Sequence, residues 1–236
     1  MVTGALPNMR ATKVNEVVLI SHSNLLYWWP AIVTGYVIAL VTYFQGNLVT
    51  TNAGSISYVH SSNNPGLLFI TVLIGLIVFS NAKLRGIYSV VALISFGFIA
   101  VLFAWFGWWD EIFSLIPQLS AKANVGFYLV FSTVLLIVWL LGVFVFDRFS
   151  YWRVRPGQFA QISHVGGGVQ SFDTQGMRFE RREQDYFRHI VLGLGSGDLV
   201  FYGKDLQSGS ITIPNVSFVD TKAIEIARLI AIKPES

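Results

Sequence analysis

The sequence predicts a membrane α-helical protein with four transmembrane helices, followed by a small C-terminal β-barrel or sandwich with one helix. Its 236 residues are 53% hydrophobic and only 12% charged, whereas an ordinary soluble domain is about 25% charged. No Asp, Glu, Lys or Arg occurs between Glu16 and Lys83. Ten of the sixteen Lys and Arg residues lie after position 150, so a polar tail follows an apolar first part.

Four segments carry the prediction of spans, because a bilayer core about 30 Å thick needs about 20 apolar residues in a helix. They cover residues 25–44, 66–81, 87–108 and 125–146. We therefore expect an N-terminal segment over residues 1–24, a transmembrane domain over 25–148 and a strand-rich domain over 149–236.

Positive charge in the short flanks predicts the orientation, because Lys and Arg are enriched in cytoplasmic loops. The loop between the second and third predicted spans is basic, and so is the segment after the fourth. We therefore expect a multi-pass protein of the cytoplasmic (inner) membrane with both termini in the cytoplasm. The juxtamembrane basic residues are Lys83, Arg85, Arg148, Arg153 and Arg155.

The two loops on the opposite side differ in character. Residues 45–65 are polar and alternate around Ile56 and Tyr58, which predicts a short hairpin. Residues 109–124 place apolar side chains beside Asp110 and Glu111, which favours a short helix lying at the membrane interface.

Nothing in the predicted spans indicates chemistry, because they hold no ionisable side chain and such groups mark transport or catalysis. The chain has no cysteine, so disulfides and thiolate metal sites are excluded. His22 and His60 are predicted on opposite sides of the bilayer and cannot share one ion. We expect no catalytic residue, no metal and no cofactor.

The tail has short β-like runs separated by glycine turns, which is typical of about six antiparallel strands. The last segment, "SFVDTKAIEIARLIAIK", is predicted to be a helix with Asp220 as its N-cap. Val219 and Ile224 have the spacing of a hydrophobic staple. Ile224, Ala227 and Ile230 with Ala231 form the expected apolar stripe.

Two motifs, "LGLGSGDLVFYG" and "ITIPNVSFVDTKAIEIARLI", follow the predicted spans. Together they resemble the bacterial pleckstrin-homology-like domains carried by small membrane proteins, and the match covers mainly residues 190–230. The N-terminal "NEVVLISHSNLLYWWP" is similar to the apolar strand that leads into the first span of that family. The resemblance implies a PH-like fold for the tail. Four spans, where two are commoner, and the segment "GGGVQSFDTQGMRFERREQDYFRH" depart from the family pattern.

The glycines of "GLGSGD" raise the alternative of a nucleotide loop. A dinucleotide fingerprint needs G-x-G-x-x-G followed by a helix. Here the third glycine, Gly197, comes one residue early, and the β-like run "LVFYG" follows. A tight turn leading into a strand is the favoured interpretation.

A group of arginines in the tail is the one candidate contact site for anionic lipid or a partner: Arg178, Arg181, Arg182 and Arg188. Acidic residues interleave with them, so an ion-paired surface is the competing interpretation. The dense basic stripe of a nucleic-acid binder is missing, and we expect no nucleic-acid partner.

Three functions follow from these patterns. The leading hypothesis is a non-enzymatic membrane protein whose PH-like domain is an interaction or scaffold module, as an accessory subunit of a larger complex. Its partners would be the lipid bilayer and a membrane protein or a second copy of the chain. The first alternative is a module that senses anionic lipid, and the second is a small transporter or membrane enzyme.

Overall fold

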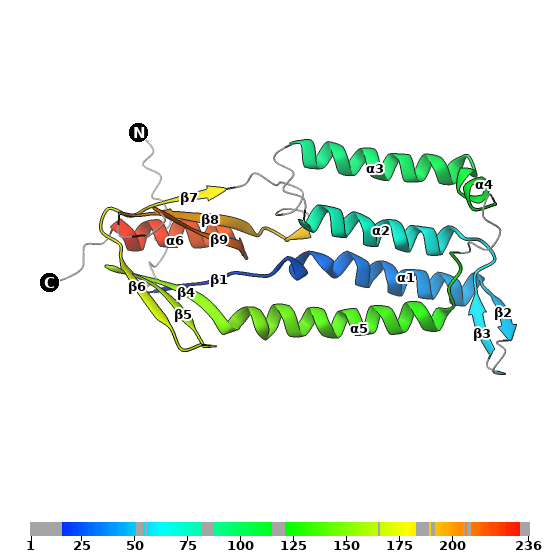
Figure 1. The fold of residues 1–236 in the computed structure, drawn as a ribbon, viewed down its shortest axis with the longest axis horizontal. Coiled ribbons are helices and arrows are strands. Elements are labelled where there is room, and N and C mark those ends of the chain that lie inside the picture. Colours follow the sequence, from blue (N-terminus) through cyan, green and yellow to red (C-terminus); the bar gives the residue numbers. More distant parts are fainter. Residues whose placement is uncertain are drawn as a thin grey trace, which may run out of the picture.

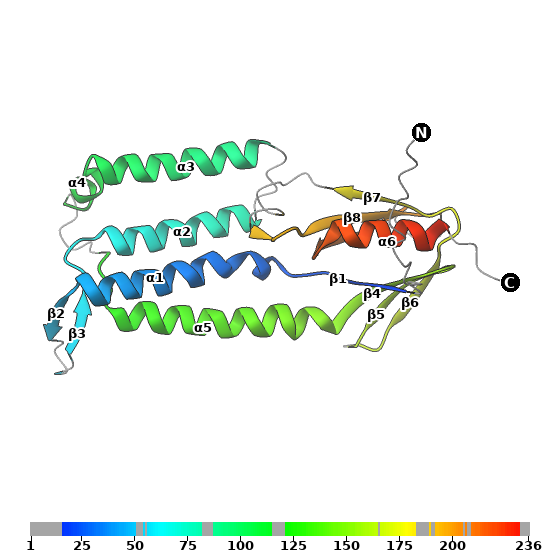
Figure 2. The same cartoon turned by 180° about the vertical axis from the view of Figure 1, so that it is seen from behind.

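The computed structural model describes residues 16–50, 54, 56–81, 87–114, 121–164, 166–182, 189, 192–204, 206 and 209–231. Long helices lie side by side in one part of the molecule, and sheets with one helix form the other (Figure 1). Seen from behind, the small hairpin β2–β3 stands at the end of the helices opposite the larger sheets (Figure 2).

The helical part begins with the 3-10 turn η1 (Asn24–Trp28) and α1 (Trp29–Gln45). It continues with α2 (Asn64–Asn81), α3 (Ile87–Trp105), α4 (Trp108–Ser114) and α5 (Val125–Phe144). Pro30 stands in the first turn of α1, where its missing N–H is not needed. Asn124 caps α5 because its side chain accepts a hydrogen bond from the Phe127 N–H at 2.7 Å.

The prediction of four transmembrane helices is wrong. Among the described residues, two helices are long and apolar enough to cross a membrane, at Asn24–Gln45 and Val125–Phe149. The apolar parts of α2 and α3, Asn64–Ser80 and Ile94–Phe103, are 10–17 residues long. At 1.5 Å per residue, apolar stretches of this length fall short of a bilayer core about 30 Å thick. Apolar composition had suggested four spans, whereas two helices among the described residues are both long and apolar enough for one.

The two long helices pack against each other through small and hydroxyl side chains. Gly35 of α1 lies against Ser132 of α5, so closely that a Cβ at Gly35 would collide with the Ser132 Oγ. At the next residue of each helix, the Tyr36 and Thr133 hydroxyls are 2.9 Å apart. Only 11% of the apolar α5 window is buried inside the molecule, which is unlike a core helix of a water-soluble domain.

The loop between α1 and α2 forms a hairpin, as predicted. Strand β2 (Asn47–Thr50) pairs antiparallel with β3 (Ile56–Val59). A helix, α4, also occurs in the predicted interfacial loop. Its position at a membrane interface stays a prediction.

The strand domain contains two antiparallel sheets. The first has the order β1-β4-β5-β6 and the second β7-β8-β9. Strand β1 (Val17–Ile20) precedes all the long helices, yet pairs with β4 in the register Val17↔Val154. The other strands are β4 (Ser150–Arg155), β5 (Gln158–Ser163), β6 (Val169–Asp173), β7 (Arg178–Arg182), β8 (Gly197–Tyr202) and β9 (Ser210–Val216). Residues 17–20 thus complete a domain whose remaining strands lie more than 120 positions later.

Both sheets and the C-terminal helix α6 (Val219–Ala231) enclose one apolar core. Phe159 of the first sheet stacks on Phe201 of the second, with ring centroids 4.6 Å apart. Trp152 also stacks on Phe159, with ring centroids 4.8 Å apart. Aromatic stacking therefore joins the two sheets, beyond the area that these rings bury.

Helix α6 starts two residues earlier than predicted, at Val219, and turns a different face to the core. Asp220 lies in its first turn and is not the N-cap. Val219, Ile226 and Leu229 are buried, while Ile224 is 59% exposed. The expected staple and stripe through Ile224 are therefore wrong. The helix offers two overlapping apolar stripes, and contact with the sheets selects the one that starts at Val219.

Candidate functional site

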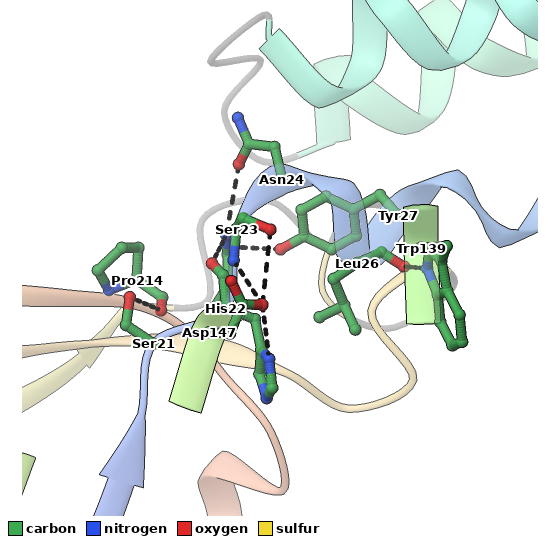
Figure 3. A network of polar contacts seen from close by, with 10 residues as sticks. Ser21, His22, Ser23, Asn24, Leu26, Tyr27, Trp139, Asp147 and Pro214 are labelled. Atoms are coloured by element: carbon green, nitrogen blue, oxygen red, sulfur yellow. Dashed lines mark hydrogen bonds and ion pairs between the residues drawn. The ribbon is translucent and has the colours of Figure 1, made fainter. Parts of the chain in front are cut away.

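The strand domain meets the long helices in a network of polar contacts around residues 21–27 (Figure 3). This junction segment leads from β1 through η1 into α1. The 3-10 turn η2 (Phe146–Phe149), which joins α5 to β4, lies on one side of it. The end of β9 contacts it as well, since the Ser21 hydroxyl donates to the Pro214 carbonyl at 3.0 Å.

Asp147 on η2 is one centre of the network. Its Oδ2 lies 3.0 Å from Nδ1 of His22 and accepts a hydrogen bond from the Ser23 N–H at 3.1 Å. The His22 and Asp147 side chains are only 12% and 9% exposed, so the carboxylate is held by protein groups in a largely dry place. A carboxylate that accepts from a backbone N–H and faces an imidazole fixes η2 to the junction segment.

Asn215 at the end of β9 is the other centre. Its amide Nδ2 donates to the His22 carbonyl at 2.9 Å, and its Oδ1 accepts from the Tyr27 hydroxyl at 2.5 Å. Its backbone N–H donates to Oδ1 of Asp198 at 2.9 Å. Its φ of 54° lies in the left-handed region, which asparagine tolerates better than most residues. Both its side chain and its backbone are therefore suited to this position.

A histidine, a serine and an aspartate extend the network into the loop before β8. Nδ1 of His189 is 3.4 Å from Oγ of Ser196, and its Nε2 is 3.8 Å from Oδ1 of Asp198. The residue types are those of a hydrolytic triad. However, His189 and Ser196 are 3% and 4% exposed, and Asp198 also holds the backbone of Asn215. The arrangement acts as a brace between the loop and β9.

Two tryptophans complete the junction at the ends of the long helices. Nε1 of Trp29, the first residue of α1, donates to the Leu192 carbonyl at 2.9 Å. Nε1 of Trp139 in α5 donates to the Leu26 carbonyl at 3.3 Å. The first bond ties the start of α1 to the segment before β8, and the second ties α5 to η1.

The arginines predicted as a contact site lie mostly on β7, an edge strand of the second sheet. Arg181 forms an ion pair with Asp220 of α6. Arg182 donates to the Tyr202 hydroxyl at 3.0 Å, and that hydroxyl donates to Glu180 at 3.1 Å. Arg178 is exposed, and Arg188 lies outside the described residues. Whether this group contacts lipid or a partner stays a prediction.

The juxtamembrane basic residues have separate surroundings. Arg148 is exposed on η2. Arg155 donates to Glu16 at 2.8 Å, and Arg153 approaches the same carboxylate at 3.8 Å. The hydrogen bond from Arg155, with the positive charge of both arginines, holds the pKa of the Glu16 carboxyl below its ordinary value. Lys83 and Arg85 lie outside the described residues.

The glycine motif leads into a strand, as predicted, because β8 begins at Gly197. Gly195 has a φ of 87°, and its N–H donates to the His189 carbonyl at 2.9 Å, closing a wide turn. Gly197 serves a different purpose, because a Cβ there would come within 2.8 Å of Val219. It allows the start of α6 to lie against β8. The phosphate-loop alternative lacks the helix that it needs directly after the glycines.

A cavity of about 510 Å³ lies between α2 and α3. Its walls include Leu68 and Gly75 of α2 and Phe96 of α3, with Trp109 and Leu192 among the residues that complete them. None of its lining side chains carries a charge. It is suited only to apolar contents. Within the described part of the chain, no group of three or more His, Cys, Asp or Glu residues is placed to hold a metal ion.

Sequence reasoning missed the junction almost entirely. It took His22 as a surface or interfacial histidine and Tyr27 as part of an aromatic belt at the membrane boundary, and it gave no role to Asp147 or Asn215. These residues come from three segments, 22–27, 147 and 215, that are separated by more than 60 residues, and no spacing rule connects them. The one available signal was "HSN" between an apolar strand and an apolar helix, a polar cluster at a domain boundary.

Comparison with protein-family models, with curated proteins and with solved structures finds no match to this chain.

Proposed function

We propose that this chain is a non-enzymatic, membrane-anchored interaction module in which α1 and α5 cross the bilayer and hold the strand domain at one face. In this function the strand domain is a rigid docking body. It works as a scaffold or accessory subunit of a larger membrane complex, with a membrane protein or a second copy of the chain as its partner.

The observation that carries the proposal is the double connection between the two parts. One connection runs from β1 through η1 into α1, and the other from α5 through η2 into β4. Because β1 and β4 are neighbours in one sheet, both long helices enter the same edge of the strand domain. The network of Asp147 and Asn215 then fixes the orientation of that domain. Two connections and a polar network that hold a domain in one orientation are expected where its orientation relative to a partner matters.

The two antiparallel sheets with α6 packed on them support the resemblance to bacterial PH-like domains. In this chain the first strand comes from before the helices, which agrees with the similarity of residues 15–30 to the family's leading strand. The centre of the strand domain is filled by apolar side chains. Its outer surface is therefore the part that would contact a partner.

We further propose that the strand domain faces the cytoplasm and that the membrane is the cytoplasmic (inner) one. Arg148, Arg153 and Arg155 follow α5 at this end, as the positive-inside rule requires. The hairpin β2–β3 would then lie on the outer side. Because the chain lacks cysteine, single substitutions Ile56→Cys and Gln175→Cys report the two sides without background. In intact cells a membrane-impermeant maleimide should label the first and spare the second. The reverse pattern would refute this orientation.

The function itself is tested on the full chain at its native level, extracted in mild detergent and examined by native mass spectrometry after crosslinking. We expect a complex of fixed stoichiometry with one membrane protein or with a second copy. Asp147→Ala should weaken that complex, because it removes the contacts that hold η2 to the junction segment. The matched variant Asp173→Ala, which removes a carboxylate from the exposed end of β6, should not. A strictly monomeric particle with no partner would contradict the proposal.

A further inference from the structure

Two large apolar side chains project from turns of the strand domain into the surroundings. Leu194 is 72% exposed and Phe218 is 71% exposed. Both also adopt left-handed backbone conformations, with φ of 51° and 52°, where glycine or asparagine is usual. Each position therefore combines an unfavourable backbone with an unfavourable exposure to water, and such outliers persist where they have a use.

The two turns lie against each other. The Val219 N–H, directly after Phe218, donates to the Gly195 carbonyl, directly after Leu194, at 3.4 Å. Gly197 approaches Val219 so closely that a side chain would not fit between them. Leu194 and Phe218 are thus carried by adjoining turns, and we call this pair the apolar tip.

The apolar tip lies at the level where the long helices begin. Leu192, two residues before Leu194, is buried among helix residues that include Tyr27, Ala31 and Leu76. Its carbonyl accepts the hydrogen bond from Trp29 at the first residue of α1. Tryptophan at the end of a spanning helix is typical of the membrane–water interface. The apolar tip is therefore continuous with the boundary of the proposed spans.

A second exposed apolar pair occurs at the same junction. Phe146 and Phe149 of η2 are 61% and 40% exposed, and they flank Asp147, which binds the junction segment. Phe218 is three residues from Asn215, which binds the same segment from the other side. Exposed apolar side chains therefore occur on η2 and on the turn after β9. Both regions contact the junction segment that leads into α1.

We propose that Leu194 and Phe218 insert into the boundary between lipid headgroups and acyl chains, and so seat the strand domain directly on the bilayer. This inference rests on the proposed crossing of the membrane by α1 and α5. The occupant is lipid because the tip adjoins the ends of those helices, where a bilayer surface has to lie. Immersion removes both side chains from water.

The test uses the full chain in lipid nanodiscs of phosphatidylcholine and phosphatidylglycerol, with single-cysteine variants carrying a nitroxide spin label. Leu194→Cys and Phe218→Cys report on the apolar tip. Gln175→Cys, in the exposed turn after β6, is the aqueous reference, and Val37→Cys, on the exposed side of α1, is the lipid reference. We expect the ratio of oxygen to nickel-chelate accessibility at the tip to exceed that at Gln175→Cys several-fold. Doxyl-labelled lipid should broaden the two tip signals.

Each other outcome is decisive. Tip labels as accessible to nickel chelate as the label at Gln175→Cys, with the label at Val37→Cys in lipid, would overturn the inference and leave the proposed anchoring intact. A label at Val37→Cys in water would refute the anchoring itself. Tip labels shielded from nickel, oxygen and doxyl lipid alike would indicate cover by a second copy of the chain, and would overturn the inference too. The two tip variants are independent, so misfolding of one leaves the other as the test.

Discussion

The Tyr27 hydroxyl lies 2.5 Å from Oδ1 of Asn215, although 188 positions separate the two residues in the chain. Both side chains are buried, at 0% and 3% exposure. Tyr27 belongs to the 3-10 turn that begins the helical part, and Asn215 to the last strand of the strand domain. This contact joins the helical part to the strand domain at the junction.

Removing that hydroxyl should weaken the whole chain. Tyr27→Phe leaves the buried Oδ1 of Asn215 without this donor, which we expect to lower the free energy of unfolding by about 1–3 kcal/mol. Thermal unfolding in detergent measures the change. Tyr58→Phe, in the hairpin at the opposite end, is the control and should have little effect. Equal stability of Tyr27→Phe and the natural chain would mean that the contact adds nothing.

Asn215 itself has separable roles in the backbone and in the network. Asn215→Gly keeps the left-handed conformation and removes only the side-chain contacts, whereas Asn215→Ala removes the contacts and adds strain. We expect Asn215→Ala to be less stable than Asn215→Gly by about 1 kcal/mol, the usual penalty of that region for a residue with a Cβ. Chemical unfolding of both variants under one condition gives the difference. The opposite order would show that the backbone conformation is not maintained.

The contact between α1 and α5 depends on the missing side chain of Gly35. A Cβ there meets Ser132 Oγ and comes within 3.1 Å of Phe69, so Gly35→Ala should destabilise by about 1–3 kcal/mol through overpacking. Gly97→Ala is the matched control, because a Cβ at Gly97 meets nothing within 4 Å. It should be neutral or stabilising by about 0.5–1 kcal/mol, since alanine favours helix.

A double-mutant cycle isolates the pair. Ser132→Ala removes the Oγ that a Cβ at position 35 would strike, so it should offset part of the loss caused by Gly35→Ala. Strictly additive losses would place the cause elsewhere than in this contact.

Gly197 is predicted to be intolerant of even a small side chain. Gly197→Ala places a methyl group 2.8 Å from Cγ1 of Val219 and should displace the start of α6, with a loss of about 1–3 kcal/mol. Gly168→Ala, where a Cβ meets nothing within 4 Å, should leave stability nearly unchanged. Hydrogen exchange of the α6 amides distinguishes the two variants. Unchanged protection of α6 in Gly197→Ala would contradict the assigned role.

The ion pair of Glu16 with Arg155 and Arg153 predicts a dependence on pH. The folded-state pKa of Glu16 lies below its ordinary value of 4.5. Its contribution is therefore complete above pH 4.5 and is lost as the pH falls through the lower folded-state pKa. Glu16→Gln should remove this acid-side loss and reduce the difference from the natural chain to zero at low pH. Unfolding midpoints measured over that range check the sign. A difference that grew on acidification would refute it.

The sequence by itself indicated the strands of the tail, the hairpin and the strand after "GLGSGD", because alternation, turn glycines and β-branched runs act over a few residues. It also located the apolar helices, although not which of them are long enough to cross a membrane. In α2 and α3 the apolar composition suggested spans, but the apolar stretches described there are shorter than a bilayer core requires.

Only the tertiary structure decided the remaining features. Strand β1 joins a sheet whose other members begin at Ser150, and pairing across such a distance leaves no local pattern. The buried stripe of α6 was chosen by the sheets that it covers, not by its own periodicity. The junction brings together His22, Asp147 and Asn215 from three separate segments. In the sequence around it, each is an ordinary polar residue. Its role arises from the residues that the fold places next to it.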